Sequence, residues 1–358
     1  MVLSGLLLAP GCGGGSPGDW KIVFPGFRDG FWSLYVVGRQ GGTPVRIGPS
    51  SEPVLGEFGS SLAVSPDGGR LIVAGDVPRL IVMEADGSAR RDLGSGDPSS
   101  AVWSPDGKRI AFTGLQGGIF VIGADGKDKR RVAGIDDSGP TWSPDGKRLA
   151  FARATDDGVA VMLVDPDGGH LHLLRRLQGD IMQTHWAPDG RSLTLVRFPE
   201  GYALPDLVTL SLTGGRVLRR IPGVGPQYNA VSWSPDGRQL AFVKKNGRLV
   251  VMNADGGGRR SLGVGSDPSW APDGRTIAYV AGERPGGSEL RSIRPDGTGM
   301  RRLTHNYPNG VGSVMPAWLR GSFRPRPVSG TGSDRADRAC APHRRRPLHR
   351  PAKRAGPA

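Results

Sequence analysis

The sequence has 358 residues, of which 58 are Gly and 31 are Pro, and 37% are hydrophobic. This composition favours many short strands joined by tight turns over long helices, and no apolar run approaches the roughly 20 residues that a membrane-spanning helix needs. The net charge is +14, but ten Arg and one Lys against two Asp place +9 of it in residues 320–358, so this charge does not mark a folded surface for nucleic acid.

The first 19 residues, MVLSGLLLAPGCGGGSPGD, are predicted to be a signal segment followed by a flexible linker. The stretch from Val2 to Ala9 is mostly apolar, the small residue Gly11 precedes Cys12, and Gly, Ser and Pro follow. This order resembles the end of a bacterial lipoprotein signal, in which an apolar segment directs export and a cysteine thiol receives lipid. The resemblance implies a lipid anchor at Cys12 and an extracytoplasmic, membrane-anchored location. The alternative is an apolar N-terminus with a chance cysteine.

A ten-residue pattern then recurs six times. The copies are VSPDGGRLIV at Val64, WSPDGKRIAF at Trp103, WSPDGKRLAF at Trp142, WAPDGRSLTL at Trp186, WSPDGRQLAF at Trp233 and WAPDGRTIAY at Trp270. Trp318 is a degenerate seventh anchor, and the spacings between anchors are 39, 39, 44, 47, 37 and 48 residues. A period of about 40 residues with four short strands in each unit indicates a β-propeller.

Each unit is predicted to contain four strands. The first ends at the anchor residue, and SPDG then turns the chain, because Pro, Asp and Gly favour the backbone angles and side-chain bonds of a tight turn. The second strand is a stretch such as KRIAF, the third is apolar and ends in an Asp-Gly turn, and the fourth carries an Arg pair. In the second strand, Ile110 and Phe112 flank the small Ala111, so both faces of a blade are expected to pack against neighbours.

The two ends of the repeat region are complementary. Asp19 to Ile47 matches the last three strands of a blade, and Ser313 to Trp318 matches a first strand. The sequence therefore predicts an all-β domain over residues 20–319, a β-propeller of seven four-stranded blades that is closed by pairing of the N- and C-terminal strands. Six blades are the alternative if the end strands do not pair.

The repeat resembles the propeller repeats of TolB and related bacterial proteins, which are distant relatives of WD-repeat propellers. The matching residues are Pro140 to Phe151, PTWSPDGKRLAF, and Ala254 to Leu262, ADGGGRRSL. The resemblance covers about Trp20 to Trp318 and implies the fold. TolB itself has an N-terminal α/β domain, and we expect none here because the first strand is predicted to start near Trp20.

Alternating strands place the variable loops on one side of the predicted ring. These are the loops after each second strand and between blades, and loops that differ between repeats usually form a binding surface. Acidic and aromatic residues gather in them. The candidate partner-binding residues are Asp137, Asp157, Glu200, Tyr202, Asp206, Tyr228, Asp267 and Tyr307. The alternative is a set of solvated loops without a partner.

No catalytic or metal-binding constellation is recognisable in the sequence. DxDG strings such as VDPDGG lack the downstream Glu of an EF-hand and lie at hairpin turns, so turn formation explains them. The Arg pairs are expected to protect the outer strand edges from pairing; a ring that meets anionic lipid is the alternative. A metal-dependent lyase needs several His at the central channel, and only His185 lies on an inner strand. We expect no enzyme activity, cofactor or metal.

Residues 320–358 form a basic Pro/Arg-rich tail that is expected to be disordered. The hypothesis for the whole chain is a non-enzymatic, monomeric propeller of the bacterial cell envelope or periplasm. It would serve as a scaffold that binds another envelope protein and touches the membrane only through its lipid anchor. The alternative is a small-ligand-binding protein or a metal-dependent lyase- or hydrolase-like enzyme that uses the central channel.

Overall fold

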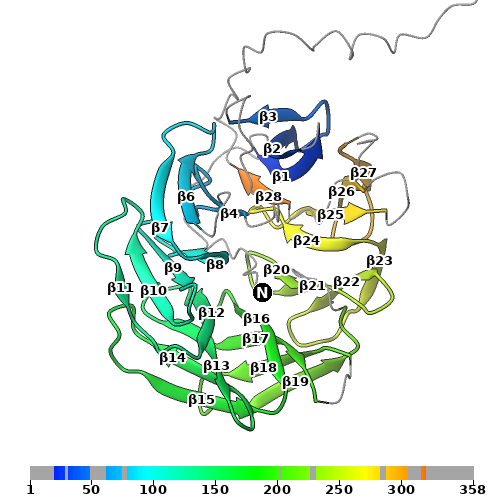
Figure 1. Ribbon diagram of the computed structural model, residues 1–358. Coiled ribbons are helices and arrows are strands. Elements are labelled where there is room, and N and C mark those ends of the chain that lie inside the picture. The colour runs from blue at the N-terminus through cyan, green and yellow to red at the C-terminus, as the bar shows by residue number, and fades with distance from the viewer. Residues whose placement is uncertain are drawn as a thin grey trace, which may run out of the picture.

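The computed structural model describes residues 20–28, 31–48, 62–74, 79–200, 204–225, 231–282, 288–304 and 316–319. Within this part of the chain, 28 strands form seven four-stranded antiparallel sheets. Figure 1 shows the sheets around a common axis as the blades of a propeller. The predicted all-β fold and its seven blades are confirmed. Among the described residues, no helix is long and apolar enough to cross a membrane.

Blades 1 to 6 each use four consecutive strands. Blade 1 contains β4 (Leu62–Val64), β5 (Arg70–Ala74), β6 (Arg79–Glu84) and β7 (Arg91–Ser95), and blade 2 contains β8 (Asp97–Trp103), β9 (Arg109–Thr113), β10 (Ile119–Gly123) and β11 (Arg130–Arg131). Blade 3 contains β12 (Asp137–Trp142), β13 (Leu149–Thr155), β14 (Gly158–Val164) and β15 (His172–Leu177), and blade 4 contains β16 (Asp180–Trp186), β17 (Ser192–Phe198), β18 (Asp206–Ser211) and β19 (Val217–Pro222). Blade 5 contains β20 (Val231–Trp233), β21 (Gln239–Val243), β22 (Arg248–Asn253) and β23 (Arg260–Val264), and blade 6 contains β24 (Ser266–Trp270), β25 (Ile277–Ala281), β26 (Glu289–Ile293) and β27 (Arg301–Arg302).

Blade 7 joins the two ends of the folded region, as the sequence predicts. Its strands are β28 (Ala317–Leu319), β1 (Lys21–Arg28), β2 (Phe31–Gly38) and β3 (Val45–Ile47), in that order across the sheet. β28 runs antiparallel to β1, with Ile22 opposite Trp318. The buried indole of Trp318 also donates from Nε1 to Ser269 O of blade 6 at 3.1 Å. The ring is therefore closed by backbone pairing and by side-chain packing.

Alternation within the second strands explains the packing between blades. In β9, Phe112 faces the core between blades 1 and 2, whereas Ala111 faces the core between blades 2 and 3. In β13, Phe151 and Ala150 divide their contacts between the preceding and following blades in the same way. Each seam thus combines the bulky face of one blade with the thin face of its neighbour, so that both faces of a blade are covered.

Candidate functional site

The strand order divides the loops between two sides of the ring. The turn face carries the turns after the first and third strands of each blade. The variable face carries the loops after the second strands and the connections between blades. The two faces differ in what their residues do within the fold, and this difference locates the candidate site.

The SPDG turns of the turn face are held by their own side chains. In the turn after β8, Ser104 Oγ donates to Asp106 Oδ1 at 2.6 Å, and the Lys108 amide donates to the same oxygen at 3.0 Å. Burial raises the pKa of Asp106, but these hydrogen bonds and the charges of Arg109 and Lys108 outweigh it and hold the pKa below its ordinary value. The same Ser–Asp bond recurs after β12, β20 and β4. The acidic residue serves the turn in each of these blades.

Arginines of the second strands join neighbouring blades on the turn face. The guanidinium carbon of Arg109 lies 4.8 Å from the ring centroid of Trp142 in the next blade, and its Nη2 donates to Gly146 O at 3.2 Å. Arg70 stacks in the same way on Trp103. Such cation–π contacts contribute roughly 0.5–2 kcal/mol each. The Arg and Trp residues that recur in the repeat therefore make contacts between neighbouring blades.

The outer-strand Arg pairs also act between blades. Arg91, Arg219 and Arg260 each donate from Nη1 to a backbone carbonyl of the next blade's second turn. The acceptors are the carbonyl oxygens of Asp125, Ala254 and Asp296. These arginines thus tie blades 1, 4 and 5 to their successors at the perimeter, a role that the repeat pattern alone does not reveal.

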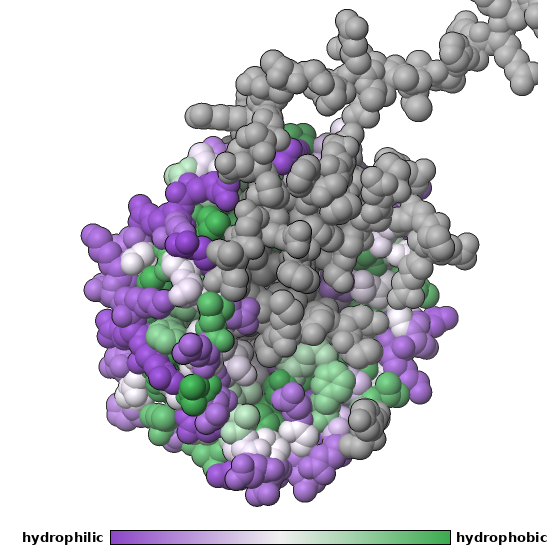
Figure 2. All heavy atoms as spheres, viewed as in Figure 1, coloured by the Kyte–Doolittle hydropathy of each residue, from purple (hydrophilic) through white to green (hydrophobic). Residues whose placement is uncertain are grey.

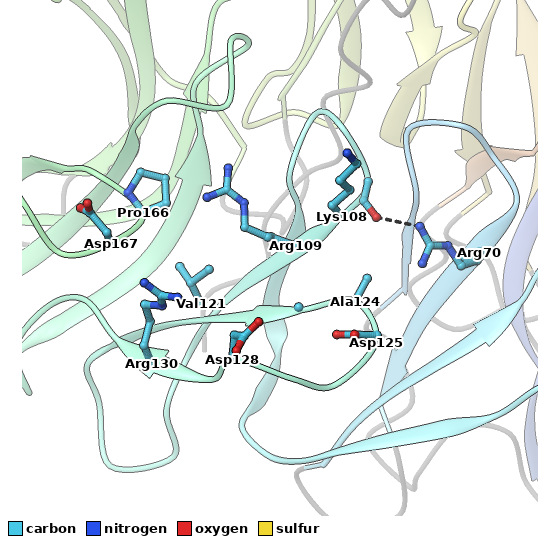
Figure 3. A pocket seen from close by; sticks show the side chains of 12 residues that line it. Arg70, Lys108, Arg109, Val121, Ala124, Asp125, Asp128, Arg130, Pro166 and Asp167 are labelled. Carbon is cyan, nitrogen blue, oxygen red and sulfur yellow. Dashed lines mark hydrogen bonds between the residues drawn. The ribbon is translucent and has the colours of Figure 1, made fainter.

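A pocket of about 480 Å³ on the turn face brings together residues of blades 1, 2 and 3 (Figure 3). Its lining includes four cations and three carboxylates: Arg70, Lys108, Arg109, Arg130, Asp125, Asp128 and Asp167. The dashed line in Figure 3 marks the bond from Arg70 Nη2 to Gly107 O, which is 2.7 Å long. Because Arg70 and Arg109 already join neighbouring blades, this pocket belongs to the architecture of the ring.

The variable face carries several exposed aliphatic side chains. Leu115 follows β9 and Ile135 precedes β12, and they are 53% and 59% exposed. Leu204, in the loop before β18, and Val264, at the end of β23, are also exposed. On the side of the ring drawn in Figure 2, hydrophobic residues likewise lie between the hydrophilic residues of the rim. Of these four residues, Leu115 and Ile135 line one pocket, and contiguous apolar groups of this kind, unlike single ones, are typical of surfaces that bind other proteins.

Two of the predicted partner-binding residues are buried in ion pairs. Asp137 accepts hydrogen bonds from Arg153 Nε at 2.6 Å and Nη2 at 2.8 Å, and also from the Gly134 amide at 2.5 Å. Asp206 binds Arg197 through both carboxylate oxygens, at 3.0 and 2.8 Å, and it also contacts Arg220. Hydrogen bonding to these carboxylates raises the pKa of Arg153 and of Arg197. Asp137 and Asp206 therefore stabilise loops of the variable face from inside the blades.

The other predicted partner-binding residues are spread over the chain. Asp157 and Glu200 are exposed on the variable face. Asp267 is buried in β24 with φ of 51°, in the position that Gly139 occupies in β12. The remaining predicted residues lie outside the described part of the chain: Cys12, Tyr202, Tyr228 and Tyr307. The structure does not bring Asp157, Glu200 and Asp267 together into one cluster, since they belong to blades 3, 4 and 6.

His185 is the one buried histidine among the described residues. Burial lowers its pKa from 6.5 to about 4, and its Nε2 lies 3.5 Å from Gln183 Oε1. Thr194 lies opposite His185 in the strand register, and its Oγ1 is a buried polar atom without a hydrogen-bond partner in the described structure. Within the described residues, no three His, Cys, Asp or Glu side chains are placed to hold a metal ion.

Sequence reasoning missed the arginine partners and the exposed aliphatic residues. Arg153 and Arg197 lie in the second strands β13 and β17, and the predicted partner-binding residues included only acidic and aromatic side chains. The spacing of these two arginines from the acidic residues across a hairpin could have indicated the pairing, because residues near the same end of two antiparallel strands lie side by side. Leu115 and Ile135 carry no such signal, since single apolar residues in loops are common.

Comparisons with known proteins agree with the fold. A family model described as the TolB beta propeller domain matches residues 157–319. The Tol-Pal system protein TolB of Anaeromyxobacter dehalogenans (strain 2CP-C) is 34% identical over 110 residues, which are 29% of this chain and 24% of that protein. The match thus spans about a quarter of the length of this curated relative.

Solved structures share the architecture at low sequence identity. TolB from Acinetobacter baumannii has a TM-score of 0.51 and 19% identity, over 80% of this chain and 79% of that chain. An oligogalacturonate lyase in complex with manganese has a TM-score of 0.59 and 15% identity, over 75% of this chain and 84% of the lyase. At such identities the likeness concerns the fold. The folded part of this chain therefore has the β-propeller fold of these proteins, and residues 157–319 match the TolB beta propeller domain.

Proposed function

We propose that the protein is a non-enzymatic scaffold of the bacterial cell envelope that binds another protein on its variable face. The observation that carries this proposal is the difference between the two faces. Arginine, tryptophan and aspartate side chains of the turn face are engaged in turns and in contacts between blades. Exposed aliphatic residues occur on both sides of the ring, but Leu115 and Ile135 of the variable face lie together in the lining of one concave site, and neighbouring apolar groups of this kind gain free energy when a partner covers them.

The envelope location rests on two further observations. The curated relatives are Tol-Pal system proteins, which supports an envelope role for this chain. The apolar N-terminal stretch followed by Cys12 supports export and a lipid tether. Lipid attached at Cys12 would hold the propeller near a membrane, while the Gly/Ser linker after it would leave the variable face able to meet a partner.

Site-specific photo-cross-linking in the native cells tests the partner face. A benzophenone amino acid is introduced at Leu204 or Val264 on the variable face, and at Leu171 or Met300 as matched controls. The controls are equally exposed residues near the starts of outer strands, on the side of the turn face. We expect a discrete cross-linked protein from the first pair and none from the second. Equal cross-linking from both pairs, or none from the first, overturns the proposal.

The lipid anchor has its own test. Cells labelled with radioactive palmitate should incorporate label into the wild-type protein, and Cys12→Ala should abolish it. Equal labelling of both proteins would rule out lipid attachment at Cys12, while the partner-face proposal would still depend on the cross-linking result alone.

A second candidate function is a metal-dependent enzyme or ligand-binding protein that uses the central channel. The shared fold with an oligogalacturonate lyase in complex with manganese favours it. Its weakness is the donor set, since the described residues contain no group of three potential metal-binding side chains. Incubation with Mn²⁺ and polygalacturonate, followed by ultraviolet absorbance of unsaturated products, separates the two functions. A Mn²⁺-dependent rise in absorbance would favour the enzyme.

A further inference from the structure

A groove of about 290 Å³ lies beside the loops that connect β9 to β10 and β11 to β12. It is lined by Ser95, Phe112, Gly114, Leu115, Gln116, Gly117, Phe120, Lys129, Arg131 and Ile135. These residues come from blade 2 and from the end of blade 1, so the groove follows the seam between the two blades. We call it the blade 1–2 groove.

The groove has an aromatic floor and a basic side. Phe112 and Phe120 stack with ring centroids 5.7 Å apart. Lys129 Nζ lies 5.2 and 5.3 Å from these two centroids and donates to Ser95 O at 3.2 Å. With Arg131, Lys129 gives the lining two cations, and the lining contains no carboxylate. The groove therefore favours an apolar group that is accompanied by negative charge.

The apolar rim is held in a fixed geometry. The amide of Gly118 donates to Asp137 O at 3.0 Å, and the amides of Gly114 and Gly117 close the loop between them through bonds of 2.9 Å. A Cβ on Gly117 would lie 1.9 Å from Ile135 O, which shows how closely the two loops approach. The Asp137 side chain in turn holds the Gly134 amide. A rim that is already ordered loses little conformational entropy on binding.

We propose that the blade 1–2 groove binds an extended segment of a partner protein that presents an apolar side chain next to one or two carboxylates. The apolar side chain lies between Leu115 and Ile135 above the aromatic floor, and the carboxylates face Lys129 and Arg131. The groove volume is at the lower end of small-molecule sites, which suits one or two side chains. This inference rests on the proposed function and names the chemistry of the partner.

A concave groove with two cations favours such a segment over an anionic membrane surface. Membrane attraction through charge contributes about 1 kcal/mol for each basic residue near the surface and needs several of them together. The apolar rim, by contrast, provides the central anchor that protein-binding surfaces use, with charged groups beside it to select the partner.

Peptide selection tests this inference on the purified full-length protein. A library of short random peptides displayed on phage is selected on the wild type and counter-selected on Ile135→Asp. We expect enriched peptides to share an aromatic or aliphatic residue next to Asp or Glu. Their synthetic versions should bind Ile135→Asp and Leu115→Asp at least roughly tenfold more weakly. Because both residues are more than half exposed, the variants should melt at the wild-type temperature.

A charge reversal provides the specific control. Lys129→Glu should weaken the acidic peptides and should bind versions in which Lys replaces Asp or Glu, whereas Lys127→Glu, outside the lining, should behave as the wild type. Enriched peptides without acidic residues, or binding that ignores Ile135→Asp and Lys129→Glu, overturn the inference. A third outcome also overturns the inference: the protein sediments with phosphatidylglycerol vesicles, Lys129→Glu abolishes this sedimentation, and no peptide binds. The groove would then bind a lipid surface.

The outcome is separable from that of the proposed function. If the cross-linked partner still binds the groove variants but depends on Val264, the groove inference fails and the proposed function stands. If no partner cross-links from the variable face, the proposed function fails, whatever peptides the groove selects.

Discussion

Replacing His185 by Ser should make the propeller less sensitive to acid. The His185 side chain is 3% exposed in β16, between blades 4 and 5, and burial lowers its pKa from 6.5 to about 4. Ser is a suitable replacement because Ser232 and Ser269 occupy the same position, directly before the anchor Trp, in blades 5 and 6. The change removes the titrating ring and keeps a small polar side chain.

The sign follows from proton binding in the two states. From about one pH unit above 6.5 upwards, His185 is neutral in both the folded and the unfolded state and contributes almost nothing to the pH dependence of stability. As the pH falls from 6.5 towards 4, the unfolded chain binds a proton that the folded chain does not, so the wild type loses stability. Each unit of pKa difference corresponds to about 1.4 kcal/mol, which gives a loss of about 3 kcal/mol at the lower end of this window.

Urea unfolding followed by tryptophan fluorescence measures this loss. The free energy of unfolding of wild type and His185→Ser is compared at pH 7.5, 6.5, 5.5 and 4.5, so that carboxylates common to both proteins cancel. The difference in free energy of unfolding between the two proteins should change by about 2–3 kcal/mol from pH 7.5 to 4.5, in favour of the variant. Parallel curves across this range would refute the assignment of a buried neutral histidine.

His170→Asn is a matched control with the opposite sign. The hydrogen bond from His170 to Asp165 raises the pKa of this exposed histidine. Its contribution is therefore present below pH 6.5 and is lost as the pH rises through the raised pKa. As the pH falls, the stability of the wild type should rise relative to that of His170→Asn. Relative to that of His185→Ser, it should fall.

Further predictions concern the ion pairs and the tryptophans. Asp206→Ala leaves the buried Arg197 without its carboxylate and should cost about 3–5 kcal/mol in urea unfolding, with Asp206→Asn costing less. Trp318→Ala removes a side chain that is 1% exposed at the closing seam and should lower stability by about 3–5 kcal/mol, measured from the melting temperature. Trp186→Phe loses an indole bond to the blade 3 backbone. It should cost about 1 kcal/mol more than Trp233→Phe, because Trp233 Nε1 has no hydrogen-bond partner among the described residues; equal losses would contradict this difference.

The architecture was predictable because its signals are local and repeated. Each SPDG turn fixes a hairpin, and the spacing of Trp103, Trp142 and the later anchors fixes the blade. The incomplete units at the two ends also predicted the closing blade correctly, since β28 pairs with β1.

The candidate site was less predictable because side-chain direction depends on neighbouring strands. The sequence places Asp137 and Asp206 in the loops of the variable face, but only the structure shows that Arg153 and Arg197 draw both carboxylates into the blade. The blade 1–2 groove combines residues from three separate stretches of sequence, and no single stretch contains a pattern that predicts the groove. Exposed aliphatic residues such as Ile135 gain meaning only when the neighbouring charges and loops are known.

The shared blade has a mechanical consequence. β1 pairs with β2 along its whole length, but it pairs with β28 only from Lys21 to Val23. If a tether pulls on the segment before β1 while a bound partner resists, tension enters the ring at this strand. The shorter seam should then part first, so the ring would unzip at β28 while the other six blades stay intact.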